Sequence, residues 1–86
     1  MTNQEYSNVL VGFKIRDGRI ITGVSSHALK RATSRNFSPN QIKYILENYN
    51  ISFPGTSASG SVVYMLDDEY VVVGNDGVVV SVVRRD

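Results

Sequence analysis

Apolar and polar residues follow a helical period between residues 25 and 35. At 100° per residue, one side of such a helix carries Ala28, Leu29 and Ala32, and the other side carries His27, Lys30, Arg31 and Ser34. A serine at position 25 or 26 can accept hydrogen bonds from the free amides of the first turn, and Arg35 lies in the last turn, where a cation suits the carbonyl end. The pattern predicts a first helix with one core face and one polar face.

A second helix is predicted from Pro39 to about Asn48. Ser38 is a cap residue, Pro39 suits the first helical position, and Gln41 completes the spacing of a capping box. One face of this helix is apolar and is expected to pack on a sheet; it carries Ile42, Ile45, Leu46 and Tyr49. Tyr44 points away from that face.

Two β-prone runs precede the helices, at residues 9–15 and 19–24, with Arg16-Asp17-Gly18 between them as a tight turn. They predict an N-terminal hairpin. Residues 1–7 are polar and are expected to be flexible. Between the second helix and the C-terminal part, residues 50–60 are rich in Pro, Gly, Ser and Thr, so they predict a loop.

The C-terminal part predicts three antiparallel strands at residues 61–66, 70–74 and 78–84, joined by the turns Asp67-Asp68-Glu69 and Asn75-Asp76-Gly77. Their valine runs are apolar on both faces, which indicates that at least one strand is covered on both sides or pairs with another chain. The predicted fold is a single α+β domain over residues 1–86. Two helices in its N-terminal half pack on a twisted antiparallel sheet, which consists of the hairpin and the three-stranded meander.

Composition limits the chemistry that this fold can hold. A chain of 86 residues buries only roughly 60 to 65% of the surface of its unfolded form, so any site is expected to be an open cleft. The chain has no cysteine and one histidine, which excludes disulfides and histidine-rich metal sites. It has no long apolar run and no signal-peptide pattern at residues 1–8, so we expect a cytoplasmic protein or a fragment of a longer one.

Charge is unevenly distributed along the chain. From residue 14 to residue 35 one acid, Asp17, stands against six bases: Lys14, Arg16, Arg19, Lys30, Arg31 and Arg35. From residue 36 onward six acids stand against three bases. A basic lobe on a mildly acidic body favours a polyanionic partner, either nucleic acid or an acidic protein.

The first helix holds the candidate chemistry. His27 and Arg31 are one turn apart, close enough to address the same phosphate. The alternative interpretation is an amphipathic helix whose solvated face happens to include a histidine. The acids at positions 67 and 68 are interpreted as a solvated turn and not as a metal site, because no further ligand accompanies them.

The order of these features resembles the small toxin domains at the C-termini of bacterial polymorphic toxins. That group includes contact-dependent growth inhibition effectors and shares the BECR fold, named for barnase, EndoU, colicins and RelE. The resemblance spans Ile21 to Arg84. The matching residues are Ser25, His27, Ala28, Arg31 and Arg35 in the motif S-x-H-A-x-x-R-x-x-x-R, Ser38 to Ile45 in the second helix, and Gly77 to Val83 in the closing strand.

The resemblance implies a metal-independent ribonuclease, often directed at tRNA, that is neutralised in the producing cell by a cognate immunity protein. Such a domain is the C-terminal part of a secreted or cell-surface effector and acts in the cytoplasm of the target bacterium. A histidine on the first helix and a hydroxyl residue on a late strand commonly contribute to the site, which here are His27 and Ser81. This chain departs from the family where it has serine in place of threonine, and it lacks a second histidine.

Metal-free RNA cleavage needs a base for the 2′-hydroxyl proton, cations for the charged phosphorane and an acid for the leaving 5′-oxygen. We assign His27 and Arg31 as catalytic residues on this chemistry, and Ser81 as the catalytic residue that the resemblance adds, with no metal and no cofactor. The residues expected to bind RNA are Lys14, Arg16, Lys30 and Arg35. Two other interpretations remain: a non-catalytic module that binds nucleic acid or protein through the basic lobe, and, less favoured, an immunity or antitoxin protein, because partners of basic nucleases tend to be acidic.

Overall fold

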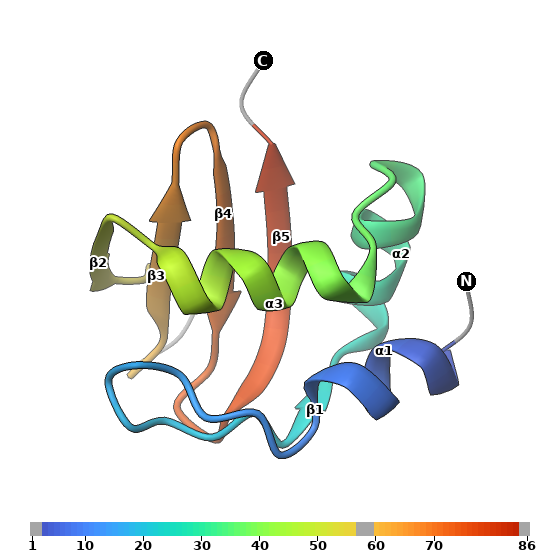
Figure 1. Cartoon of the computed structure of the whole chain (residues 1–86), viewed down its shortest axis with the longest axis horizontal. Helices are drawn as coiled ribbons and strands as arrows, with labels where there is room; N and C mark the ends of the chain where they lie inside the picture. Colours follow the sequence, from blue (N-terminus) through green and yellow to red (C-terminus); the bar gives the residue numbers. More distant parts are fainter. Residues whose placement is uncertain (1–2, 57–59, 85–86) are drawn as a thin grey trace.

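The computed structural model describes residues 3–56 and 60–84, and within these ranges it contains three helices and five strands (Figure 1). The helices are α1 (Asn3–Leu10), α2 (Ser26–Ser34) and α3 (Pro39–Asn48). The strands are β1 (Gly23–Val24), β2 (Ile51–Pro54), β3 (Val62–Leu66), β4 (Glu69–Val73) and β5 (Val78–Arg84).

The strands form one mixed sheet in the order β1-β5-β4-β3-β2. The pairs β2–β3, β3–β4 and β4–β5 are antiparallel, whereas β1 runs parallel to β5. α3 crosses one face of the sheet, and α2 lies beside β5 at the opposite end of the sheet from β2 (Figure 1). The predicted α+β class, with helices packed on a sheet and a C-terminal meander, is confirmed.

Both predicted helices begin at the expected caps. The Ser25 hydroxyl accepts a hydrogen bond from the Ala28 amide, and the Ser38 hydroxyl accepts one from the Gln41 amide, both at 3.1 Å. The predicted capping box is half formed, because the Gln41 side chain donates to the Glu69 carboxylate of β4, 3.0 Å from Oε2. Gln41 therefore joins the first turn of α3 to the sheet.

Replacement of Ser38 by alanine is expected to lower the free energy of unfolding by about 1 kcal/mol, because the Gln41 amide loses its acceptor. Urea unfolding followed by circular dichroism measures the change. Ser34→Ala is the matched control, since the exposed Ser34 hydroxyl donates only to the Arg31 carbonyl within α2. Equal losses from the two variants would show that the Ser38 cap contributes nothing of its own.

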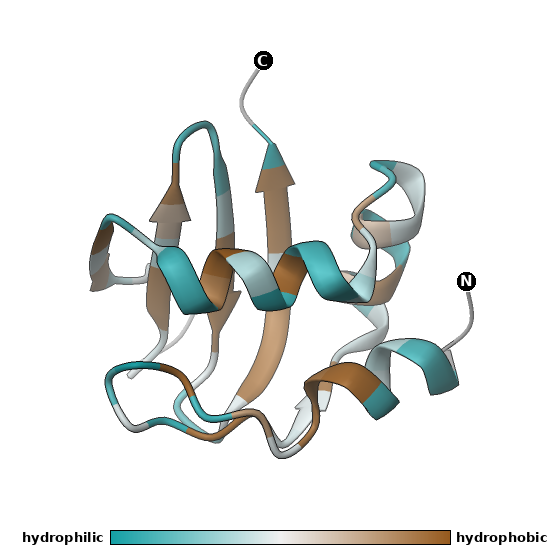
Figure 2. Cartoon of the chain, in the orientation of Figure 1, coloured by the Kyte–Doolittle hydropathy of each residue, from teal (hydrophilic) through white to brown (hydrophobic). Residues whose placement is uncertain are grey.

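The core lies between α3, α1 and one face of the sheet (Figure 2). α3 contributes Ile42, Ile45 and Leu46, which are fully buried as predicted, while Tyr44 is 59% exposed. The strands contribute the fully buried Tyr64, Val71, Val73, Val79 and Val82. Burial of these side chains is the main source of the stability of the fold.

The N-terminal segment differs from the prediction. Residues 3–7, expected to be flexible, form the first turns of α1, and Met1 and Thr2 lie outside the described residues. Tyr6 and Leu10 are one turn apart and fully buried, and the Tyr6 hydroxyl donates to the Phe37 carbonyl. Helix α1 therefore gains its stability from tertiary packing and not from the propensity of its polar residues.

The predicted N-terminal hairpin is formed only in part: Lys14 and Ile20 make an antiparallel bridge, and the amides of Ile15 and Ile21 donate to the carbonyls of Arg19 and Phe13. The tight turn lies where the sequence indicates, with the Gly18 amide donating to the Ile15 carbonyl at 2.9 Å. The residues expected to form the first strand start inside α1, however. The residues expected to form the second strand end in β1, which pairs with β5 in parallel and not with residues 9–15.

The loop predicted over residues 50–60 is wrong at its start, because residues 51–54 form β2 along β3. All four residues of β2 are exposed, as expected for an edge strand that packs against nothing on its outer side. Residues 57–59 lie outside the described residues. The expectation from the valine runs is confirmed, since Val71, Val72 and Val73 of β4 are all buried, although consecutive residues face opposite sides of the sheet.

Tyr64 of β3 connects the turn at residues 16–18 to the core face of the sheet. Its ring meets Tyr49 edge-on at 4.9 Å between centroids, and its hydroxyl donates to Asp17 Oδ2 at 2.5 Å. Burial raises the pKa of Tyr64 well above the ordinary value of 10.0, and the hydrogen bond to Asp17 raises it further. The folded state therefore holds the phenolic proton more tightly than the unfolded chain does.

The stability that depends on this proton is fully present below pH 10 and is lost as the pH rises above it, because the unfolded tyrosine ionises first. We expect the free energy of unfolding to fall by up to about 1.4 kcal/mol per pH unit for this group. Tyr64→Phe should reduce that slope, measured by urea unfolding at neutral pH and above pH 10. An unchanged slope would contradict the assignment to Tyr64.

Candidate functional site

The polar face of α2 presents its cations and the histidine to solvent. His27, Lys30 and Arg31 are exposed, and no other described residue forms a hydrogen bond or ion pair with their side chains. On the opposite side of the helix Ala28 and Ala32 are fully buried, which fixes the orientation of the polar face. His27 and Arg31 are neighbours on that face, one turn apart, so both can contact one bound anion.

Arg35 has a different environment from these residues. Its Nη1 donates to the Val82 carbonyl of β5 at 3.1 Å, and its own carbonyl accepts from Arg84 Nη1 at 2.9 Å. The ladder between β1 and β5 ends at Val79, so none of the described strands lies along the outer edge of β5 beyond that point. Arg35 satisfies a carbonyl of this edge, and its guanidinium is therefore held by the strand instead of being presented beside His27.

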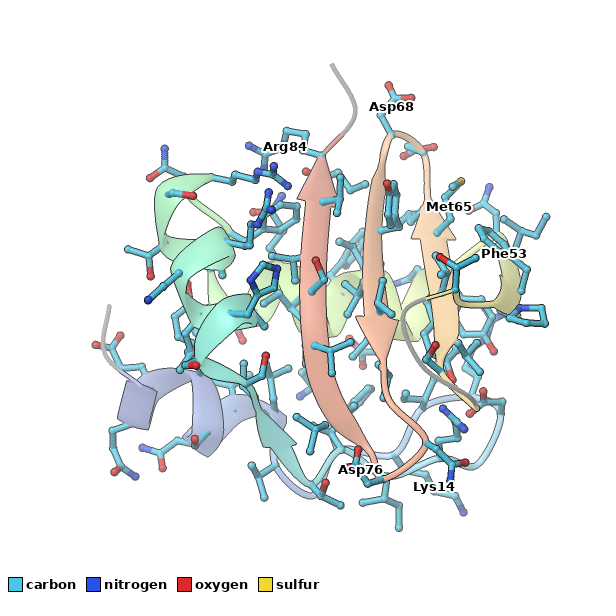
Figure 3. All side chains as sticks on the ribbon, turned by 180° about the vertical axis from the view of Figure 1, so that it is seen from behind. Lys14, Phe53, Met65, Asp68, Asp76 and Arg84 are labelled. Atoms are coloured by element: carbon cyan, nitrogen blue, oxygen red, sulfur yellow. The ribbon has the colours of Figure 1, made fainter. Side chains whose placement is uncertain are left out.

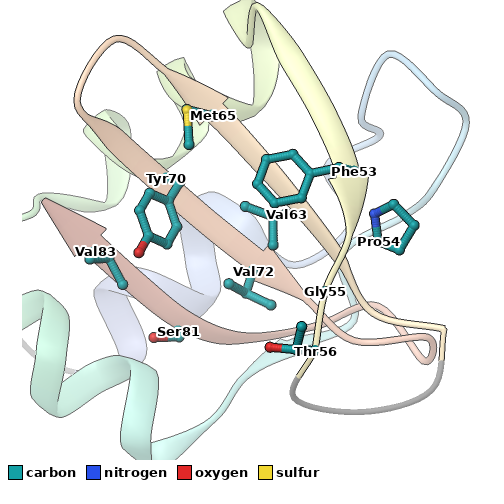
Figure 4. A pocket seen from close by; sticks show the side chains of 10 residues that line it. All are labelled: Phe53, Pro54, Gly55, Thr56, Val63, Met65, Tyr70, Val72, Ser81 and Val83. Carbon is teal, nitrogen blue, oxygen red and sulfur yellow. The ribbon is translucent and has the colours of Figure 1, made fainter. Parts of the chain in front are cut away.

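Ser81 lies on β5, the strand that α2 contacts, and its side chain lies on the face of the sheet opposite α3. That face is hollowed to a volume of about 450 Å³, which we call the sheet hollow (Figure 4). Its lining includes Phe53, Val63, Tyr70, Val72 and Ser81. The structure thus places Ser81 in an open depression next to the strand edge that α2 covers.

The basic residues of the predicted lobe do not form one surface. Lys14 is exposed on the segment before β1, far from α2 in the view of Figure 3. Arg16 stacks on the Tyr49 ring with 4.1 Å between its guanidinium carbon and the ring centroid. Arg19 donates to the carbonyls of Gly74 and Gly60. The cations that remain beside His27 are Lys30 and Arg31.

A polar cluster that the sequence did not indicate lies where β4 and β5 meet α3. The Glu69 carboxylate accepts from Arg84 Nε at 2.8 Å and from Gln41, and Arg84 stacks on the Phe37 ring at 4.6 Å. Glu69 and Arg84 are directly opposite each other in the β4–β5 register, on the α3 side of the sheet. The cluster is therefore separated by the sheet from Ser81, and it joins α3 to the strands.

The sequence interpretation also missed Phe53, Thr56 and Tyr70 as members of a site. The signal that would have found Tyr70 is alternation: Tyr70 and Val72 share one face of β4, while Val71 and Val73 share the core face. Phe53 and Thr56 fell within the predicted loop, where no alternation was expected. Phe53 is 40% exposed and lies at the rim of the sheet hollow.

The remaining chemistry of the described residues is limited. In residues 3–56 and 60–84, no three His, Asp or Glu side chains lie close enough together to hold a metal ion. No helix in the same ranges has the length and hydropathy needed to cross a membrane.

Comparison of the chain with protein-family models, with curated protein sequences and with solved structures gives no match.

Proposed function

We propose that this chain is a metal-independent endoribonuclease, with tRNA as its target and His27 as its acid–base group. The observation that carries the proposal is the pairing of an exposed histidine and an exposed arginine, one turn apart on a helix beside β5, with the hollow that Ser81 lines on the same strand. RNA cleavage without a metal requires acid–base and cationic groups, and a nearby hydroxyl can donate a hydrogen bond to the phosphate.

In the proposed reaction the 2′-hydroxyl oxygen attacks the adjacent phosphorus while the bond to the 5′-oxygen breaks, which leaves a 2′,3′-cyclic phosphate. His27 accepts the 2′-hydroxyl proton, and the leaving oxygen takes a proton either from the same imidazole or from water. Arg31 and Lys30 stabilise the extra negative charge of the phosphorane. Ser81 donates a hydrogen bond that positions the phosphate or the ribose beside it.

The resemblance to polymorphic toxins supports a biological setting for this activity. In that setting the domain is part of a longer secreted or cell-surface effector, acts in the cytoplasm of a target bacterium and is neutralised by a cognate immunity protein. The exposed cations on α2 give an acidic immunity partner a complementary surface. Binding there would cover His27 and Arg31 together.

Incubation of the purified protein with total bacterial RNA in excess EDTA tests the proposal. We expect discrete fragments on a denaturing gel, with 2′,3′-cyclic phosphate ends and with tRNA as the main substrate. Intact RNA would contradict the enzyme assignment. Retention of that intact RNA by the protein, weakening as salt rises, would then favour the non-catalytic nucleic-acid-binding module.

A further inference from the structure

The sheet hollow has an apolar floor and aromatic sides. Val63 and Val72 form the floor and are 7% and 6% exposed. The Phe53 ring extends over this floor from β2, and the Tyr70 ring lies on the side towards β4 and β5 (Figure 4). Phe53 keeps 40% of its surface exposed on an edge strand, where solvation of an aromatic ring costs free energy that a stacked ligand would recover.

The polar groups of the sheet hollow are hydroxyls. Ser81, Thr56 and Tyr70 contribute one each, and no charged side chain is among the described residues that line it. A lining of this kind suits a flat, neutral ligand with apolar faces and hydrogen-bonding edges. At about 450 Å³ the volume lies within the usual range of small-ligand sites. An ionic group would find no counter-ion there, and a lipid chain would leave the three hydroxyls unused.

We propose that the sheet hollow binds one nucleobase of an RNA strand, with Phe53 as the stacking platform. The proposal rests on the ribonuclease function for its ligand class. Every base has an aromatic face that can stack, and its edges can pair with hydroxyl groups. Ser81 lines the hollow from β5, the strand that α2 contacts, so an RNA strand with one base in the hollow can extend over α2, the helix that carries the exposed cations Lys30 and Arg31. Base and phosphate thereby contact adjoining surfaces of matching chemistry.

RNA binding is best measured in the His27→Ala background, where the proposed cleavage is expected to be slowed by about 10²- to 10⁴-fold. The probe is a short single-stranded RNA, followed by fluorescence anisotropy, with the four free ribonucleosides added in a parallel NMR titration. We expect Phe53→Ala to weaken RNA binding by about 5- to 100-fold. Nucleosides, which carry no phosphate, should shift the resonances of Val63, Val72 and Tyr70.

Tyr44→Ala is the matched control, since Tyr44 is an exposed aromatic residue on α3, away from the sheet hollow, and should leave RNA binding unchanged. Phe53→Trp keeps an aromatic face and should retain binding, whereas Phe53→Leu keeps apolar bulk and should lose it. These two variants separate stacking from any effect of Phe53 on folding.

The outcomes distinguish this proposal from the ribonuclease itself. If the wild type cleaves RNA but the Phe53→Ala and Tyr44→Ala variants bind RNA equally well, the base site is overturned. The enzyme assignment then still stands. Binding that depends on Phe53, without cleavage by the wild type, would support the base site and remove the enzyme. Failure of both RNA and nucleosides to perturb the sheet hollow would overturn the base site, and a protein segment would then be the occupant to examine.

Discussion

Replacement of His27 by alanine is expected to lower the rate of RNA cleavage by about 10²- to 10⁴-fold, the usual contribution of a positioned acid–base group. The fold should remain intact, because the His27 side chain is exposed and has no hydrogen bond to another described residue. Single-turnover cleavage of tRNA in EDTA measures the loss, and urea unfolding shows that the variant is folded. Expression in bacteria without a partner protein should also become easier.

Ser26→Ala is the control for this substitution, because Ser26 is exposed on the same turn of α2 and the helix cap is Ser25. Its cleavage rate should equal that of the wild type. If the His27→Ala protein also cut RNA at the wild-type rate, His27 would have no part in the chemistry. The solvated-face interpretation of α2 would then be the correct one.

Replacement of Gly77 by alanine is expected to lower the free energy of unfolding by about 3 kcal/mol or more. Gly77 has φ +90°, where a side chain costs about 1–2 kcal/mol, and an added Cβ would lie 2.3 Å from the Ile20 carbonyl oxygen. Relief of this clash separates the β4–β5 turn from residues 20–22. The hydrogen bond from the Thr22 amide to the Gly77 carbonyl, 3.0 Å long, would then be lost at a further cost of about 1–3 kcal/mol.

The Gly18→Ala variant separates the conformational cost of a positive φ from the cost of the clash with Ile20. Gly18 has φ +97°, but an added Cβ would meet no atom within 4 Å. It should therefore carry the conformational cost alone, about 1–2 kcal/mol. Thermal and urea unfolding of both variants give the comparison, and equal losses would show that the contact with Ile20 does not restrict this turn.

Local signals account for what the sequence predicted well. Helices α2 and α3 begin at serine caps and show a clear helical period, so both their limits and their buried faces follow from nearby residues. Helix α1 has the same kind of signal in a weaker form. Tyr6 and Leu10 have helical spacing, but the polar residues around them hide it, and the helix depends on burial against distant parts of the chain.

The partners of the edge strands could not be predicted from the sequence. β1, which lies within the strand predicted at residues 19–24, has two residues and pairs with Val78 and Val79, more than fifty positions away, so no local pattern can specify its partner. β2 is exposed along its whole length and takes its extended form from pairing with β3. The structure of such strands is set by the partner strand, and their own hydropathy carries little information.

In the candidate site, too, the features set by nearby residues were predictable and those set by distant residues were not. Helical periodicity predicted that His27 and Arg31 would share an exposed face, and alternation along β5 separates Ser81 from the core residue Val82. The environment of Arg35 could not be predicted, because its acceptor on Val82 is 47 positions distant. The sheet hollow is likewise built from four strands, β2 to β5, and the segment after β2, and it exists only in the folded chain.

β5 is the last strand of the described sheet to be synthesised, and it lies between β4 and the N-terminal strand β1. β1 and α2 therefore emerge from the ribosome more than forty residues before the strand that they pack against. The local hairpins of the meander can form early, whereas the contacts of β1 and α2 must wait for closure of a long loop. The elements that carry His27 and Ser81 consequently pack together only when translation has passed β5, so under the proposed ribonuclease function the growing chain is expected to be inert towards RNA until then.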